Sequence, residues 1–215
     1  MMSRNSSSNY EEMKRRMAKS FIRHDPETMI RNFRLDNDGQ YMYIDFVARR
    51  YRIDRASGKI EWSEDGFQTC RDAGYNEAMT IYDVLCCPSP ADARTEEWVN
   101  LNSLSAIMGG NLAVKKDFFQ STADFFRGKT ETLSAVCEAM GGKRLPGGDA
   151  AYELHLFWFL PLILRFWEAD DEFPPSLQIM LPGNILDFMH YETLMFAVSH
   201  LSEYLIENAK RLQAI

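Results

Sequence analysis

Four carboxylates in five consecutive residues, flanked by aromatic rings, offer the most obvious chemistry in this sequence. They lie in the stretch FWEADDEFPP, residues 166–175, and are Glu168, Asp170, Asp171 and Glu172. Carboxylate oxygens that converge can coordinate a hard cation, and like charges in close contact raise one another's pKa, as acid or base chemistry requires. The rings of Trp167 and Phe173 would lower the local dielectric and strengthen either effect. A solvent-exposed turn between two buried strands has the same composition, because charged residues also discourage edge pairing.

The other motifs in the sequence favour structural roles. The chain has four histidines, which are His24, His155, His190 and His200. None has a partner at the spacing of an H-E-x-x-H metal site. The glycine-rich loop at residues 141–148, GGKRLPGG, lacks the GK[ST] of a phosphate-binding loop. The G-x-S-x-G motif of serine hydrolases does not occur in the sequence. The stretch Asp36-Asn37-Asp38-Gly39 lacks the closing glutamate of a calcium loop and is expected to be a turn.

The cysteines predict a reducing compartment. There are four of them, Cys70, Cys86, Cys87 and Cys137. They show no C-x-x-C spacing, so we expect free thiols. Cys86 and Cys87 end an apolar helical stretch, where cysteine commonly serves as a small buried hydrophobe. A redox role for this adjacent pair is the alternative.

Composition limits the class of protein. The chain has 215 residues, of which 46% are hydrophobic and 26% charged, as in ordinary globular proteins. Its net charge of −7 argues against a nucleic-acid partner, because phosphate attraction requires a basic surface. The N-terminus lacks the apolar region of a secretory signal, and the most apolar run, residues 154–167, is interrupted by Pro161 and too short for a membrane span. We therefore expect a cytoplasmic protein without a membrane partner.

Helical spacing of apolar residues predicts several helices. One is expected at residues 10–22, with the basic residues 14–16 on its solvated face, and a second begins after the capping residue Asp25 and Pro26. Others are expected at residues 76–86, 116–126 and 131–140, with a helical turn that Gly109-Gly110 ends. A long amphipathic helix is predicted at the C-terminus.

Strand-forming residues fall in two separate segments, at about residues 40–62 and 152–181. Turns are expected at Ser57-Gly58 in the first segment and at Leu160-Pro161 in the second, and a short strand is expected at Trp98. Strands and helices do not alternate regularly, which predicts an α+β fold of antiparallel strands packed with helices. The length fits a single domain over residues 1–215, with residues 1–24 as an N-terminal helical extension.

Three motifs in the chain occur together. They are TIYDVLCC with Tyr82, EEWVNLNSLSAIMGG with Trp98, Gly109 and Gly110, and the stretch after residue 160 with Trp167, Asp170, Glu172, Phe173 and Pro174. With these motifs the chain resembles the prokaryotic family known as domain of unknown function 3786. The resemblance covers roughly residues 20 to 210, and the last motif is the most specific. Some relatives carry a cysteine-rich iron–sulfur module, but the four scattered cysteines here supply no such cluster. The resemblance lends no assigned chemistry, so catalytic residues and cofactors stay unknown.

These observations lead to one functional hypothesis and two alternatives. We predict a cytoplasmic binding or accessory domain with an acidic-aromatic groove for a small molecule or a protein partner. Its binding residues would be Trp98, Trp167, Glu168, Asp170, Asp171 and Glu172. One alternative is an enzyme that uses Glu168, Asp170 and Glu172 as metal ligands or acid–base groups. The other is a structural domain that forms homo-oligomers through exposed aromatic residues of DFFQSTADFF, residues 117–126.

Overall fold

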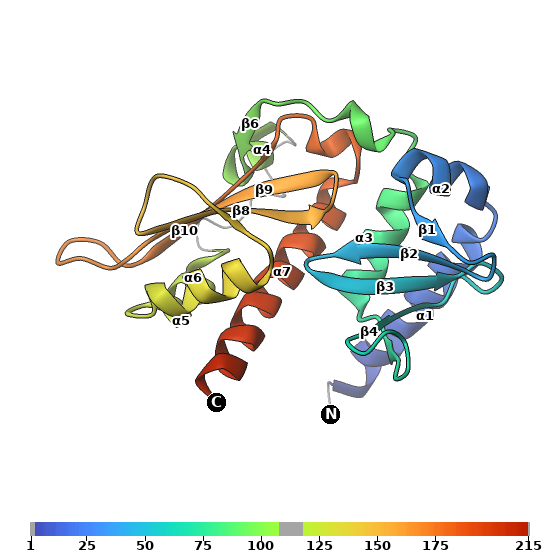
Figure 1. Ribbon diagram of the computed structural model, residues 1–215, viewed down its shortest axis with the longest axis horizontal. Coiled ribbons are helices and arrows are strands. Elements are labelled where there is room, and N and C mark those ends of the chain that lie inside the picture. The colour runs from blue at the N-terminus through green and yellow to red at the C-terminus, as the bar shows by residue number, and fades with distance from the viewer. Residues whose placement is uncertain (1–2, 108–117, 215) are drawn as a thin grey trace. The chain divides into compact units, whose positions relative to one another are not determined.

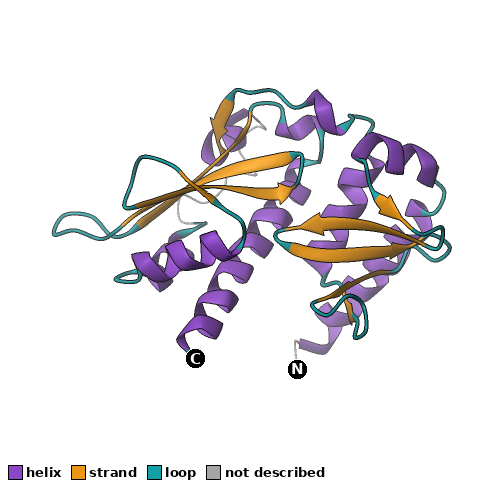
Figure 2. Cartoon of the chain, viewed as in Figure 1, coloured by secondary structure: helices purple, strands orange, loops and turns teal. Residues whose placement is uncertain are grey.

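The computed structural model describes residues 3–107 and 118–214, and these residues gather into two compact units. The first unit comprises Met1–Ala93 and Leu186–His200, and the second comprises Arg94–Ile185 and Leu201–Ile215. Each unit holds its own antiparallel sheet and helices, which confirms the α+β fold class (Figures 1 and 2). The single domain over residues 1–215 with a helical extension stays a prediction.

The first unit is built on a five-stranded antiparallel meander. In sheet order the strands are β1 (Asp36–Asn37), β2 (Tyr41–Phe46), β3 (Arg49–Asp54), β4 (Ile60–Ser63) and β5 (Arg71–Asp72). Alternate residues of β2 are buried, as period-two patterning predicts for a sheet with one face on the core. The turn at Ser57-Gly58 is confirmed, because the Asp54 carboxylate accepts hydrogen bonds from the Ser57 backbone and hydroxyl.

Helices α1 (Ser3–Phe21), α2 (Pro26–Phe33) and α3 (Tyr75–Cys86) complete most of the first unit. Asp25 caps α2 as predicted, with its carboxylate accepting from the amides of Glu27 and Thr28. Helix α1 lies beside α3 in Figure 1, and the rings of Phe21 and Tyr82 are 5.2 Å apart. The expected solvated basic face of α1 is wrong for Lys14, whose ammonium donates to the Ala73 carbonyl at 2.8 Å.

The second unit contains the other five-stranded antiparallel sheet, in the order β6-β10-β9-β8-β7. Its strands are β6 (Trp98–Asn100), β7 (Lys143–Arg144), β8 (Ala150–Phe157), β9 (Leu160–Trp167) and β10 (Ser176–Pro182). The predicted turn at Leu160-Pro161 is wrong, because the chain turns at Trp158 and Phe159 and both Leu160 and Pro161 belong to β9. Pro161 is tolerated near the strand start, next to an irregularity in the β8 pairing between His155 and Phe157.

Short helices cover this sheet, namely α4 (Leu101–Ile107), α5 (Gln120–Phe126) and α6 (Thr130–Ala139). Helix α5 packs against β10 and α6 against β8. The predicted end of a helical turn at Gly109-Gly110 lies outside the described residues, as do the first residues of the helix expected at 116–126. Two of the aromatic residues expected to be exposed are buried, since Phe119 is 6% and Phe126 0% exposed, whereas Phe118 and Phe125 are half-buried.

The long C-terminal helix is confirmed as α7 (Tyr191–Gln213), preceded by the short 3-10 turn η2 (Ile185–Asp187). A second 3-10 turn, η1 (Ala91–Ala93), follows α3 in the chain. Helix α7 contributes to the first unit up to His200 and to the second from Leu201. No helix within residues 3–107 and 118–214 combines the length and apolar character that crossing a membrane requires.

Candidate functional site

The acidic stretch forms the connection between β9 and β10. Because β9 ends at Trp167, strand alternation does not extend into the acids, and Glu168 instead bends toward the start of α6. Its Oε2 accepts hydrogen bonds from the Gly128 amide at 2.8 Å and the Thr130 hydroxyl at 3.1 Å. Its own amide donates to an Asp149 carboxylate oxygen at 2.7 Å. Glu168 therefore ties three backbone segments together.

Asp170 shapes the tip of the same connection. Its Oδ1 accepts from the amides of Glu172 and Phe173 at 2.9 and 2.7 Å, which is the hydrogen-bond pattern of an Asx turn. Asp171 and Glu172 are exposed, and the Phe173 side chain is 66% exposed. Within the described part of the chain, no three side chains of histidine, cysteine, aspartate or glutamate are grouped so that they could hold a metal ion. The assignment of these acids to ligand binding stays a prediction.

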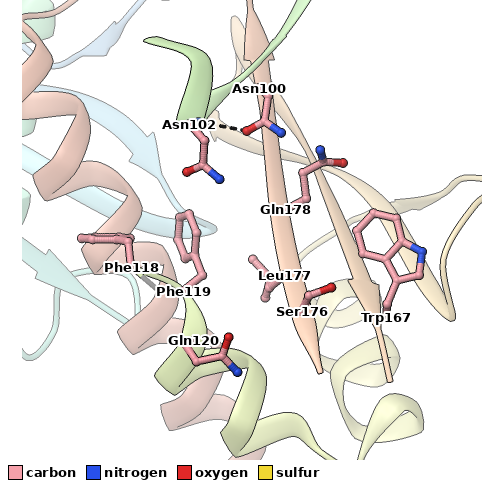
Figure 3. Close-up of a pocket in the computed structure, with 9 residues that line it drawn as sticks. All are labelled: Asn100, Asn102, Phe118, Phe119, Gln120, Trp167, Ser176, Leu177 and Gln178. Carbon is pink, nitrogen blue, oxygen red and sulfur yellow. Dashed lines mark hydrogen bonds between the residues drawn. The ribbon is translucent and has the colours of Figure 1, made fainter. Parts of the chain in front are cut away.

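A pocket of about 270 Å³ lies next to this turn, and Trp167 is one of its walls (Figure 3). Strand β10 supplies Ser176, Leu177 and Gln178. The opposite wall consists of residues at the end of β6, in α4 and at the start of α5, namely Asn100, Asn102, Phe118, Phe119 and Gln120. Of the predicted binding residues, Trp167 lines this pocket, and none of the four acids does. Most of the other lining residues were not predicted as binding residues from the sequence.

Strand register explains why these residues meet. Trp167 pairs with Ser176 across β9 and β10, and Asn100 of β6 pairs with Met180 of β10. Opposed residues of antiparallel strands share a face and alternate residues return to it, so Gln178 lies on the face of Ser176 and Trp167. Trp98 pairs with Pro182 on that face but lies beyond the pocket. The opposite face is core, with Leu162, Leu164 and Phe166 completely buried.

The pocket lining is neutral and rich in carboxamides. None of its nine residues carries a charge, and four are asparagine or glutamine. The Asn100 side-chain oxygen accepts from the Asn102 amide at 2.9 Å, and Gln120 Nε2 donates to the Pro175 carbonyl at 3.2 Å. These bonds orient two of the carboxamides. A carboxamide offers both donors and an acceptor, so the pocket can satisfy ligand groups of either kind.

A polar signal for this pocket was present in the sequence. Gln178 interrupts the apolar run of β10, SLQIML, and a polar residue among strand core residues is more informative than an apolar one. Asn100 and Asn102 gave no comparable signal, because asparagine at the end of a strand is ordinary turn chemistry.

The first unit contains a buried polar cluster that sequence patterns did not mark, formed by Arg49, Tyr51, Glu77 and His200. The Glu77 Oε1 accepts from the Arg49 guanidinium at 2.7 Å and from the Tyr51 hydroxyl at 2.6 Å, and its other oxygen accepts from the Gly74 amide. The Arg49 guanidinium also lies 3.7 Å from the centre of the Trp62 ring. All of these side chains are buried.

Burial sets the protonation states in this cluster. The pKa of Tyr51 is raised by its burial and by the neighbouring Glu77 carboxylate, so the hydroxyl stays protonated and donates. Burial lowers the pKa of His200 to about 4, so its imidazole is neutral at neutral pH. Its ring stacks on Phe46 with centres 5.1 Å apart. A buried ion pair surrounded by satisfied donors is a structural arrangement, and it joins β3, α3 and the start of α7.

The cysteines differ in burial, with Cys70 exposed and Cys86 and Cys87 half-buried rather than buried as expected. All four are free, and Cys137 is completely buried. Burial raises the pKa of the Cys86 thiol to about 11 and that of Cys137 to about 12. Thiols react as thiolates, so a raised pKa disfavours the reactive form of these two, and the redox role of the Cys86–Cys87 pair stays a prediction.

Comparison with known proteins gives one match. The model of the family described as Domain of unknown function (DUF3786) matches residues 25–204, in agreement with the resemblance seen in the sequence motifs. No curated protein and no solved structure matches the chain.

Proposed function

The chain belongs to the DUF3786 family of domains of unknown function, and we propose that it is a binding domain that holds a small, uncharged polar ligand in the pocket beside Trp167. The observation that carries this proposal is the lining of the pocket. It combines an exposed tryptophan ring with four carboxamides and a serine hydroxyl, and it contains no charged group.

The chemistry of the lining favours a neutral ligand. An anion or a cation buried in this pocket would lose hydration without gaining an opposite charge, which is unfavourable. Hydroxyl and amide groups, in contrast, act as donors and acceptors and match Asn100, Gln178 and Ser176. A ligand rich in such groups therefore fits best.

The shape of the pocket favours a small ligand with a flat or ring-shaped face. A volume of about 270 Å³ is slightly below the range of about 300 to 1,000 Å³ that is typical of small-molecule sites, which limits the size of the ligand. The indole of Trp167 is 38% exposed and can contact an apolar ligand face. Because the ring is large, this contact buries a large apolar area. A monosaccharide-sized ring with several hydroxyl or amide groups has these properties.

The acids of the turn support the pocket indirectly. Glu168 and Asp170 hold the β9–β10 connection that follows Trp167, through the hydrogen bonds described above. In this proposal they position the loop, and Asp171 and Glu172 remain solvent-exposed. Free cysteines support the cytoplasm as the location, because disulfides are rare there.

Calorimetric titration with neutral polar probes tests the proposal. We would titrate the protein with glucose, N-acetylglucosamine, inositol and uridine at millimolar concentrations and follow tryptophan fluorescence in parallel. At least one probe should bind saturably. Glucuronate, which adds a carboxylate to a sugar ring, should bind more weakly than glucose because the pocket offers no cation.

Two variants locate the binding. Gln178→Leu removes a donor and an acceptor at similar size and should weaken binding of the probe at least about fivefold, since an unpaired polar ligand group costs about 1 to 3 kcal/mol. Gln68→Leu, at an exposed glutamine of the first unit, should leave the affinity unchanged. No saturable binding by any neutral probe, or equal binding to Gln178→Leu, would overturn the proposal.

A further inference from the structure

Another cavity, of about 320 Å³, lies in the first unit and is unrelated to the Trp167 pocket. Residues of α1 form one side of it, and the β3–β4 turn, β4, β5 and α3 supply the others. Helix α1 is held firmly at this place. The backbone of Gly58 lies so close to α1 that an added Cβ would be 2.8 Å from the Ala18 carbonyl oxygen.

The floor of this cavity is apolar. Ile60, Ala78 and Tyr82 line it and are otherwise buried, with exposures of 4%, 1% and 3%. The Tyr82 hydroxyl donates to the Gly58 carbonyl at 2.7 Å, so this polar atom already has a partner and the ring contributes apolar surface. Ala18 adds a methyl group from α1.

The rim, in contrast, is basic. Four of the lining side chains are cationic, Lys14, Arg15, Lys19 and Lys59, and two are acidic, Glu11 and Asp72. This local excess of positive charge occurs in a chain whose net charge is −7. The cavity therefore differs in electrostatic character from the molecule as a whole, and it favours an anion.

Lys19 is the cation best placed to receive one. Lys59 pairs with Glu61 at 2.7 Å and with Asp72 at 2.8 Å, and Lys14 pairs with Glu11 at 3.0 Å. Arg15 lies 3.3 Å from Glu12. The side chain of Lys19, in the last turn of α1, makes no hydrogen bond or ion pair with any residue that the structure describes.

From these features we propose that the cavity binds an amphipathic monoanion, a carboxylic acid whose apolar body lies on Ile60, Ala78 and Tyr82 and whose carboxylate meets Lys19. Burial of the apolar body supplies most of the affinity, because removal of apolar surface from water is favourable. The ammonium group supplies the preference for an acid over a neutral molecule of the same shape.

The probes for this site are octanoate, below its micelle concentration, and octan-1-ol. They share an apolar chain and differ in charge. Calorimetric titration of the full chain should give saturable binding of octanoate at one site and clearly weaker binding of octanol. Added salt should weaken octanoate binding, because the ion pair lies at a partly open rim.

Substitutions test the residue assignments. Lys19→Gln should weaken octanoate at least about fivefold, and Lys19→Arg should keep most of the affinity. Lys143→Gln removes the same charge from an exposed lysine of the second unit and should have no effect. Ala18→Leu fills the cavity and should weaken octanoate and octanol alike.

Three outcomes would overturn the proposal: no saturable octanoate binding, equal binding of octanol, or a Lys19→Gln affinity equal to that of the Lys143→Gln control. None of these outcomes bears on the Trp167 pocket, because that site is tested with other probes and other variants.

Discussion

The imidazole Nε2 of His200 lies 3.6 Å from Oε1 of Glu77, and both side chains are buried in the first unit. Arg49 and Tyr51 donate to that same carboxylate oxygen. The carboxylate is thus already neutralised by the guanidinium, and the histidine beside it has little to gain from taking up a proton.

Stability should consequently fall in mild acid. Burial lowers the pKa of His200 to about 4 from 6.5, so between these values the unfolded chain binds a proton that the folded protein does not. Above pH 6.5 the titration of His200 does not change the free energy of unfolding. Lowering the pH from 6.5 to about 4 reduces that free energy by up to about 3 kcal/mol. Urea unfolding of wild type and His200→Gln across this range measures the effect. The variant should show a flatter pH dependence, while His24→Gln, at an exposed histidine, should match wild type.

Removing the buried guanidinium should be severe. Arg49→Met leaves the Glu77 carboxylate buried without its cation, which we expect to lower the free energy of unfolding by about 3 to 5 kcal/mol. The double variant Arg49→Met, Glu77→Leu buries no charge and should recover part of this loss. Arg127→Met, which breaks an exposed pair with Asp124, should cost less than about 1 kcal/mol. A double variant less stable than Arg49→Met would contradict this account.

Gly58 should tolerate no side chain. Its φ is +72°, and a Cβ would lie 2.8 Å from the Ala18 carbonyl oxygen. Gly58→Ala is therefore expected to cost about 2 kcal/mol or more, from the left-handed backbone and from displacement of α1. Gly39 has a φ of +86° but nothing within 4 Å of a Cβ, so Gly39→Ala isolates the backbone contribution at about 1 kcal/mol. Thermal unfolding of both variants gives the comparison, and equal losses would contradict close packing of α1.

The acids of the β9–β10 connection should separate into two classes. Glu168→Ala removes the acceptor for Gly128 and Thr130 and should destabilise the protein by about 1 to 3 kcal/mol. Glu172→Ala should change stability by less than about 0.5 kcal/mol, because that side chain is exposed. Melting with and without divalent cations also tests the metal-site alternative. A cation-dependent rise that Glu172→Ala abolishes would favour that alternative.

Much of the fold could be predicted because its determinants are local. Alternating burial of Met42, Ile44 and Phe46 is encoded in neighbouring residues, and Asp25 caps α2 through hydrogen bonds two and three residues away. The turn between β2 and β3 was harder to predict from the sequence. Val47 and Ala48 both have positive φ there, of 48° and 56°, whereas such turns normally contain Asn-Gly. Val47 is nevertheless completely buried.

The site could be predicted only in part, because it depends on contacts between distant segments. Trp167 was expected in a groove, and it does line a pocket, but Asn100 and Gln178 join it through strand register. The acids looked like a cluster because they are adjacent in sequence. Glu168 instead accepts hydrogen bonds from Gly128 and Thr130, and no local sequence pattern predicts these partners.

The contact of α1 with Gly58 and Tyr82 also has a consequence for the cavity of the first unit. The family match begins at residue 25, after α1 has ended, yet this helix provides Ala18 and Lys19 to the cavity of the first unit. The lining of that cavity therefore combines residues inside the matched region with residues of a helix that precedes it. In the ligand proposal above, substitutions in α1 would change Ala18 and Lys19 without altering any residue of the matched region.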